Sequence, residues 1–452
     1  RLTGLGVWTG EKFAPFRMIR RPMAERIEVE LNNGVRFACD DAHQVLVPGE
    51  KRYEWRKLVE LKPGTEIAIN RPQSMEFGHG FEGWESAYWL GYFIGNGYFG
   101  KRQVDFTIGD RPHLGLTKED THKSLVRFLR RCQMNPRKPQ WCENHVVQSF
   151  GGKHALASWA ALGVEQGATA HTKRVPQTIW SAPLERRKAF VLGYLHADGY
   201  CLRRDAVSSE EGGAIYVNTP NRELLQDVLL LCSTIGMDGR IHGPYNADRE
   251  GHIAYRLHLY RGLAHQALGL LDAARIKGGP VVPNFEAREA FARLDRTKLP
   301  AGVSRGSVRT LMHRVSKGGS VSAHLLSSLG VPPQYMVMGI KSVTRTGKRE
   351  PMFTLSVDDP SHRYCAESVV SKNCTAADIL NTATLEIVEQ IPHRGWSEFS
   401  GPCLQIHDYF GVYVPTHMGE RAARIIKEAM TTEIKGMPFP ATPKISTTWA
   451  KQ

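Results

Sequence analysis

The chain has 452 residues, of which 41% are hydrophobic and 23% are charged, and its formal charge at pH 7 is +14. This length is too great for one ordinary hydrophobic core, so we expect two to four domains of a globular, soluble protein. No apolar run is long enough to cross a bilayer, and the eight cysteines lack the spacing of a zinc ribbon or a disulfide framework.

The excess of basic residues favours a polyanionic partner, with a generally basic surface that has no such partner as the alternative, and we expect no membrane partner. Scattered thiols without a pairing pattern fit a reducing compartment. We therefore expect a cytoplasmic protein, in a bacterial or phage-infected cell.

The first segment predicts a small β unit, which we place at residues 1–78. Its alternating stretches are RIEVELNNGVRFACDDAHQVLV and TEIAIN, and Asn32-Asn33-Gly34 gives a hairpin signal between the first two strands.

A doubled motif dominates residues 83–335, where the pattern is mixed α/β. ESAYWLGYFIGNGYFG (85–100) and RKAFVLGYLHADGYCL (187–202) align as two copies. Each copy is followed by β-like text, a helix-like run and a later alternating strand. Two αββαβ-type units in one chain predict a pseudo-symmetric domain.

Small residues recur on one face of each motif helix. Gly91 and Gly95 lie four apart in the first copy, and Gly193 and Ala197 do so in the second, so the two helices can pack backbone to backbone. Asn96 and Asp198 then follow at the helix ends. Paired carboxylates at such positions can hold Mg²⁺ against a scissile phosphate. A single copy is equally well explained as a helix packing face of small residues with a polar cap. Two copies in register disfavour that explanation.

This doubled pattern resembles the LAGLIDADG homing endonucleases. The resemblance implies two αββαββα units whose sheets form a saddle over double-stranded DNA, with Mg²⁺ as the cofactor. KRVPQTIW is similar to the K-x-x-P block of intein-borne members, which implies that Lys173 acts in catalysis or phosphate contact. Asn96 departs from the family's acidic residue, and a neutral amide holds a divalent ion weakly. We therefore expect nicking, or DNA binding without cutting. Lys277 is a candidate for the basic catalytic residue of the second unit.

Residues 336–373 return to β-like text. TLSVDDPSHRYCAESVVSKNC resembles the C-terminal splicing blocks of an intein, which implies an all-β Hint-type domain split between residues 1–78 and 336–373. The Cys374 thiol would accept an acyl group from an upstream thioester. The Asn373 side-chain nitrogen would then attack its own backbone carbonyl and release the chain beyond that residue. Splicing of this kind needs no cofactor.

Further residues take roles from the same resemblance. His362 would act as acid or base in the cyclisation, and Lys372 stands where the family usually has histidine, which predicts slow C-terminal cleavage. GVRFACDDAHQVLV is similar to the block in which His43 would polarise the N-terminal scissile amide, although Asp40 replaces the usual threonine. The block with the first nucleophile is absent, so we expect a truncated intein or one half of a split system.

Residues 374–452 predict a helix, a turn flanked by strands, and a second helix. CTAADILNTATLEIVEQ and LQIHDYFGVYVP resemble the end of a family A DNA polymerase, of the type found in phages and bacteria. The resemblance implies an α+β palm fragment in which Asp408 binds Mg²⁺ and His407 contacts the primer. The intact host would use dNTPs and a primer-template, and its N-terminal polymerase portion lies outside this chain. Tyr409 replaces the usual glutamate, and HDYFG also resembles the single-subunit RNA polymerases.

Two functional classes remain from the sequence. The first is an intein with an endonuclease domain inserted in a DNA polymerase, combining splicing, hydrolase and nucleotidyltransferase activities. The second is a DNA-binding LAGLIDADG protein without cleavage or splicing, which Asn96, Lys372 and the absence of the first splicing block keep open.

Overall fold

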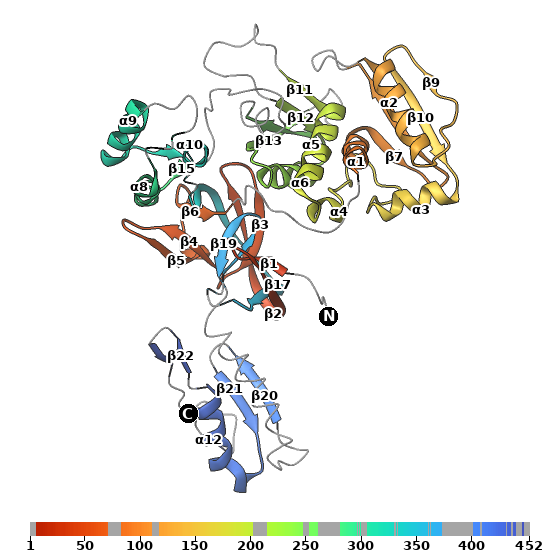
Figure 1. Ribbon diagram of the computed structural model, residues 1–452. Coiled ribbons are helices and arrows are strands. Elements are labelled where there is room, and N and C mark those ends of the chain that lie inside the picture. Colours follow the sequence, from red (N-terminus) through yellow and green to blue (C-terminus); the bar gives the residue numbers. More distant parts are fainter. Residues whose placement is uncertain are drawn as a thin grey trace.

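Figure 1 shows the computed structural model, coloured along the chain. The residues that the structure describes are 6–70, 83–110, 117–201, 215–246, 253–260, 281–295, 297, 299, 305–329, 331, 333–359, 361, 363–372, 401–406, 409–430, 432–434, 437–439 and 445–446. Within these ranges no helix has both the length and the apolar character needed to span a membrane.

Strands from residues 6–69 and strands from residues 336–372 pair in one sheet, which we call the β body (Figure 1). Its main strand order is β1-β2-β17-β6-β19-β4-β5. The early strands are β1 (Gly6–Trp8), β2 (Phe13–Leu31), β3 (Arg36–Asp40), β4 (Gln44–Pro48), β5 (Tyr53–Lys57) and β6 (Glu66–Ile69), with the 3-10 turn η1 (Leu58–Glu60) after β5. The late strands are β17 (Met336–Val357), β18 (Arg363–Ala366) and β19 (Val369–Lys372).

The sequence pattern explains the longest pairing, that of β2 with β17. Ile27, Val29 and Leu31 alternate along β2 and are all buried, as one face of a pleated strand requires. The ladder runs antiparallel from Leu31 opposite Ile340 to Phe16 opposite Val357. The predicted hairpin turn lies between β2 and β3, where Gly34 has a φ of 82°.

Two α/β units of equal plan follow. The first contains α1 (Trp84–Asn96), β7 (Gly97–Phe99), β8 (Gln103–Gly109), α2 (Lys118–Arg131), β9 (Gln140–Trp141), β10 (His145–Gly151) and α3 (Lys153–Ala161). The second contains α4 (Gln177–Trp180), α5 (Leu184–Asp198), β11 (Gly199–Cys201), β12 (Ile215–Thr219), α6 (Arg222–Ser233), β13 (Gly239–Asn246) and β14 (Ile253–Leu259). The sheet orders β7-β8-β10-β9 and β11-β12-β14-β13 correspond strand for strand. The doubled unit predicted from the sequence is therefore observed.

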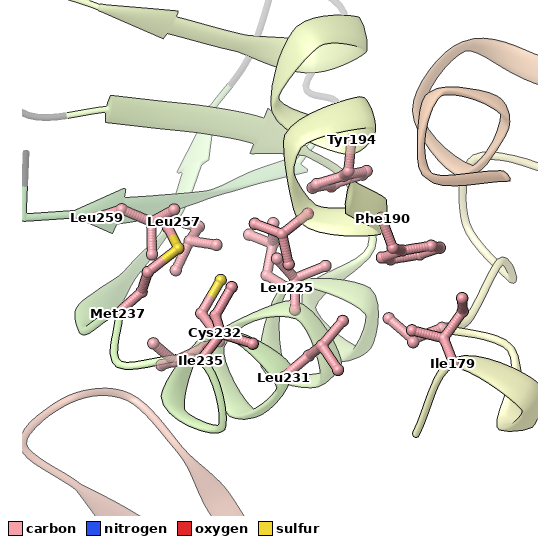
Figure 2. Close-up of a cluster of buried hydrophobic side chains, with 14 of the residues drawn as sticks. Ile179, Phe190, Tyr194, Leu225, Leu231, Cys232, Ile235, Met237, Leu257 and Leu259 are labelled. Carbon is pink, nitrogen blue, oxygen red and sulfur yellow. The ribbon is translucent and has the colours of Figure 1, made fainter. Parts of the chain in front are cut away.

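Matching side chains begin the covering helix of each unit. The Thr117 side chain accepts from the Asp120 amide before α2, and the Asn221 side chain accepts from the Leu224 amide before α6. Figure 2 shows the core that α6 then covers, where Leu225 and Cys232 face the buried side chains of β14 and α5. These contacts fix one face of each sheet and leave the other open.

A helical segment follows the second unit and joins the β body. It contains β15 (Val281–Val282), α8 (Asn284–Arg293), α9 (Arg305–Ser316), β16 (Val321–Ser322) and α10 (Ala323–Ser328). β15 pairs with β16 and, through Val281 opposite Val337, with β17. The sequence placed this segment within the domain at 83–335, whereas its strands pair with β17.

The last described elements match the expected turn between strands followed by a helix. They are β20 (Gly401–Ile406), β21 (Tyr409–Tyr413), η4 (Thr416–Met418), α12 (Gly419–Met430), β22 (Thr432–Ile434) and β23 (Met437–Phe439). β20 and β21 form one antiparallel pair and β22 and β23 another. The helix predicted after Cys374 lies outside the described residues.

Candidate functional sites

Helices α1 and α5 pack at backbone distance. A Cβ atom built on Gly91 would lie 1.9 Å from the Phe190 carbonyl oxygen, and one on Gly193 would lie 1.9 Å from the Tyr88 carbonyl oxygen. The two contacts are reciprocal, so each glycine makes room for the other helix. Only residues without side chains permit this approach. The helix contact expected from the small-residue face is present.

The same packing brings the helix ends together. The Asn96 amide nitrogen donates to the Ala197 carbonyl at 2.9 Å. A Cβ atom on Gly95 would lie 3.2 Å from the Asp198 carboxylate carbon. Asn96 and Asp198 therefore end two helices that meet, one from each unit.

Lys173 lies under the end of α1. Its exposed fraction is 7%, and burial lowers the pKa of its ammonium to about 8, while the charge of Asp198 acts to raise that pKa. Its Nζ atom lies 2.6–3.3 Å from four backbone carbonyls, those of Phe93, Ile94, Gly95 and Gly97. The last carbonyls of a helix lack partners within the helix, and a cation there complements the helix dipole. The lysine therefore orders the backbone that presents Asn96.

The donor set at the helix ends fits a hard divalent cation. Asp198 offers a carboxylate and Asn96 an amide oxygen, both of which Mg²⁺ accepts as ligands. Among the described residues no group of three or more His, Cys, Asp and Glu side chains is arranged to hold a metal ion. A Mg²⁺ ion usually takes one or two carboxylates and completes its shell with water and substrate phosphate, so a sparse set suits it.

Sequence reasoning missed His196, which α5 buries beside α1. Its Nδ1 atom forms a short hydrogen bond with the Tyr88 hydroxyl, and its ring lies edge-on to Tyr92 at 5.2 Å. The signal was present, because a histidine within an otherwise apolar motif helix needs a polar partner when buried.

The open face of the second sheet is aromatic and basic, which the sequence reading also missed. Tyr216 stacks on Tyr200 at 5.5 Å and lies 4.8 Å from the His258 ring. The Arg256 guanidinium lies 5.5 Å from the Tyr216 ring and donates from Nε to Asn218 at 2.9 Å. Strict alternation places these side chains opposite the buried positions of β12 and β14. Such a face suits a nucleic acid.

A second candidate site lies in the β body. The His43 Nε2 atom lies 3.0 Å from the Ser371 hydroxyl, which is buried and two residues before Asn373. β19 pairs with β4 through Ser371 opposite Val45 and Lys372 opposite Gln44. The first and last segments of the body therefore converge next to the predicted splice junction.

Neighbouring predicted positions have defined contacts. The Asp40 carboxylate accepts from the Ala42 amide at 3.1 Å, as in a local turn. The Lys372 ammonium lies 5.8 Å from the Trp55 ring. His362, Asn373, Cys374, His407, Asp408 and Lys277 lie outside the described residues.

Comparison with known protein families finds a match to the second motif helix and the strands after it. Residues 185–264 match the model of the LAGLIDADG-like domain family. The chain therefore carries a LAGLIDADG-like domain. This match covers α5, the open aromatic face and most of the second unit.

Curated relatives are distant. The gyrase A protein (DNA gyrase) of Mycolicibacterium flavescens is 22% identical over 379 residues, which cover 75% of this chain and 63% of that protein. Its counterpart in Mycobacterium kansasii is 22% identical over 363 residues with the same coverage, so the chain spans 63% of the length of both relatives. Replication factor C small subunit of Methanocaldococcus jannaschii is 24% identical over 229 residues, half of this chain and 11% of that protein.

Solved structures show partial likeness. I-DmoI in complex with DNA and Ca aligns with a TM-score of 0.29 and 16% identity, covering 42% of this chain and 91% of that chain. Full-length DUF199/WhiA from Thermatoga maritima aligns with a TM-score of 0.29 and 10% identity, covering 57% of this chain and 89% of that chain.

Proposed function

We propose that the LAGLIDADG-like region is a Mg²⁺-dependent DNA endonuclease of the homing type that acts on double-stranded DNA. The observation that carries this proposal is the meeting of Asn96 and Asp198 at the ends of two helices packed through Gly91 and Gly193. Of these two residues only Asp198 carries a negative charge, whereas two carboxylates would support metal-dependent cutting of both strands. The single charge therefore favours cutting of one strand. The open sheet face with Arg256 would bind the duplex.

The residues of the chain divide the work. Asp198 and Asn96 would hold the ion, which when bound would neutralise the scissile phosphate and lower the pKa of a water molecule. Lys173 fixes the end of α1 through its carbonyl contacts and thereby orients Asn96. The close packing of α1 on α5 keeps the two side chains at one place on the DNA.

The test is cleavage of a supercoiled plasmid library that carries a randomised insert, in the presence of Mg²⁺. We expect nicked circles from the wild type, linear product from Asn96→Asp, and neither from Asp198→Asn. Glu119→Gln removes an exposed carboxylate on α2 and should behave as the wild type. Unchanged cleavage by Asp198→Asn would remove the metal role of that residue.

We further propose protein splicing at the Asn373–Cys374 bond, supported by the contact between His43 and Ser371 beside that bond. In the step that releases the C-terminal segment, the Asn373 side-chain nitrogen bonds to its own carbonyl carbon, and the peptide bond to Cys374 breaks. Cys374 leaves as an amine that takes up the proton.

Similarity to parts of two differently named proteins, one a gyrase and the other a replication factor, fits a segment inserted in different hosts. Free cysteines among the described residues fit a cytoplasmic location.

Intact mass tests the C-terminal cleavage step of the splicing proposal. The purified chain should release a fragment that begins at Cys374, together with a partner one water molecule lighter than the hydrolysed form. Asn373→Ala should abolish release, and Lys372→His should accelerate it, whereas Lys341→His should have no effect. Release of the same fragment from Asn373→Ala would exclude cyclisation.

For the final segment we propose a palm fragment of a family A DNA polymerase. Its support is the antiparallel β20–β21 pair, which joins Ile406 to Tyr409 as expected for strands on either side of the HDYFG sequence. The intact host would bind Mg²⁺ through Asp408 and use dNTPs. Asp408→Asn in the spliced host should stop dNTP incorporation without affecting splicing. Incorporation of ribonucleotides would instead assign a single-subunit RNA polymerase.

A further inference from the structure

A basic stretch lies outside both proposed sites. Residues 296–349 contain ten Lys and Arg residues and no Asp or Glu, within a chain whose formal charge is +14. Most of the net charge is therefore concentrated in the segment that holds α9 and the first half of β17. This distribution calls for an explanation beyond general solubility.

The cations of this stretch differ in their partners. On β17, Lys341 pairs with Glu30 at 2.7 Å and Arg345 pairs with Glu25 at 2.9 Å. On and after α9, the exposed cations form no ion pair with any residue that the structure describes; they are Arg305, Arg309, Arg314 and Lys317. Two of the four cations of β17 in this stretch, Lys341 and Arg345, are therefore paired within the sheet, while the cations of α9 face solvent.

The opposite side of α9 is committed to the core. Val308 and Val315 are buried, and Leu311 and Met312 pack partly against the same core cluster. With its apolar face covered, the helix has no surface to insert into a membrane. Figure 1 shows α9 at the margin of the molecule, where a long partner can approach.

The helix is held firmly by the β body. Buried Glu286 of α8 accepts from the Tyr335 amide at 2.8 Å and from the Tyr53 hydroxyl. α8 packs against α9, and the preceding β15 pairs with β17. A ligand held on α9 would therefore be fixed relative to the β body.

We propose that the exposed basic face of α9 is a second DNA-binding surface, which contacts the phosphate backbone of the duplex away from the cleavage site. This inference rests on the proposed function, because that function supplies the duplex. Unpaired arginines at helical spacing match a row of phosphates and carry no base readout. The surface adds affinity and orientation without changing which bond is cut.

The test is binding of the full chain to a long mixed-sequence duplex over a range of salt concentrations, without Mg²⁺. Removal of one phosphate contact lowers the slope of log K against log salt by about 0.9 on duplex DNA. We expect a decrease of about 2 for Arg309→Ala/Arg314→Ala. The wild-type slope should persist in Arg309→Lys/Arg314→Lys and in Arg127→Ala/Arg130→Ala, a control that removes equal charge from exposed positions of α2.

Three results would overturn the proposal. One is an unchanged slope for the α9 alanine variant, and another is an equal decrease for the α2 control, which would reduce the effect to net charge. Either would leave the endonuclease proposal standing, because plasmid nicking is measured separately. The third is absence of duplex binding by the wild type, or binding of single-stranded RNA alone, which would remove both proposals.

Discussion

Lys173 illustrates at the scale of one residue how the site is positioned. Its three ammonium hydrogens are shared among four carbonyls at the end of α1, in a buried location that disfavours the charge. The K-x-x-P resemblance implied catalysis or phosphate contact. The geometry indicates a positioning residue, because its donors are engaged by backbone.

Lys173 predicts a pH dependence of stability. Its pKa is about 8 in the folded chain and 10.5 in an ordinary environment, so between those values the unfolded chain binds more protons. The free energy of unfolding should therefore rise with pH across this window, by at most about 1.4 kcal/mol per pH unit.

Urea denaturation at several pH values measures this effect as the difference between the wild type and Lys173→Met, which cannot titrate. The exposed Lys153→Met serves as the control and should keep the wild-type rise. An identical pH profile for the wild type and Lys173→Met would contradict the assignment.

At the scale of elements, the α1–α5 contact depends on positions that carry no side chain. Gly193→Ala places a Cβ atom 1.9 Å from the Tyr88 carbonyl, so the helices must separate. The helix-propensity gain of alanine is about 1 kcal/mol at most, and overpacking against backbone exceeds it. We expect a net loss of about 2 kcal/mol in the free energy of unfolding.

The control for this prediction is Gly306→Ala, at an exposed position of α9. It should leave stability unchanged or slightly raised, since alanine favours the helix. Asn96 and Asp198 should also separate in Gly193→Ala, so nicking should decrease more than DNA binding. A variant as stable as the wild type would show that the interface tolerates separation.

Sequence periodicity predicted these elements because each depends on local pattern. The small residues of the two motif helices and the turn at Gly34 act within a few residues of the chain. The features that the sequence did not show depend on contacts between distant segments. The engagement of Lys173 by α1 and the pairing of Val281 with Val337 arise only when the chain is folded.

The same limit applied to the candidate sites. Asn96 and Asp198 were predicted because each lies at the end of a recognisable motif helix. Arg256 was missed because its site is a sheet face assembled from three strands, and no single stretch carries that signal. The contact of His43 with Ser371 likewise joins residues 328 positions apart.

At the scale of the molecule, the two α/β units interrupt the β body in sequence but supply none of the strands in its sheet. Its hydrogen bonds with the second unit involve two turns: the Ile241 amide donates to the Asn33 carbonyl at 2.9 Å, and Gln226 bonds the Arg36 backbone and the Glu367 carboxylate. The pairing of β2 with β17 needs neither unit. We therefore expect the body to fold without them.

Strand register shows how to remove the insert. Val337 pairs with Ala68 on one side and with Val281 on the other. Ala68 and Val281 are therefore about 10 Å apart at ordinary strand spacing. A Gly/Ser linker of about eight residues spans about 15 Å on average and can replace residues 71–280. The shortened chain should unfold cooperatively in urea and keep strand-rich circular dichroism.

A longer deletion, of residues 71–329 with the same linker, tests whether this stability belongs to the strands alone. It also removes Glu286, the acceptor for the Tyr335 amide and the Tyr53 hydroxyl. Each buried donor left without a partner costs about 1–3 kcal/mol, so the longer deletion should unfold at clearly lower urea. Equal midpoints would show that α8 adds nothing to the body, and collapse of both chains would show that the two α/β units are required for its folding.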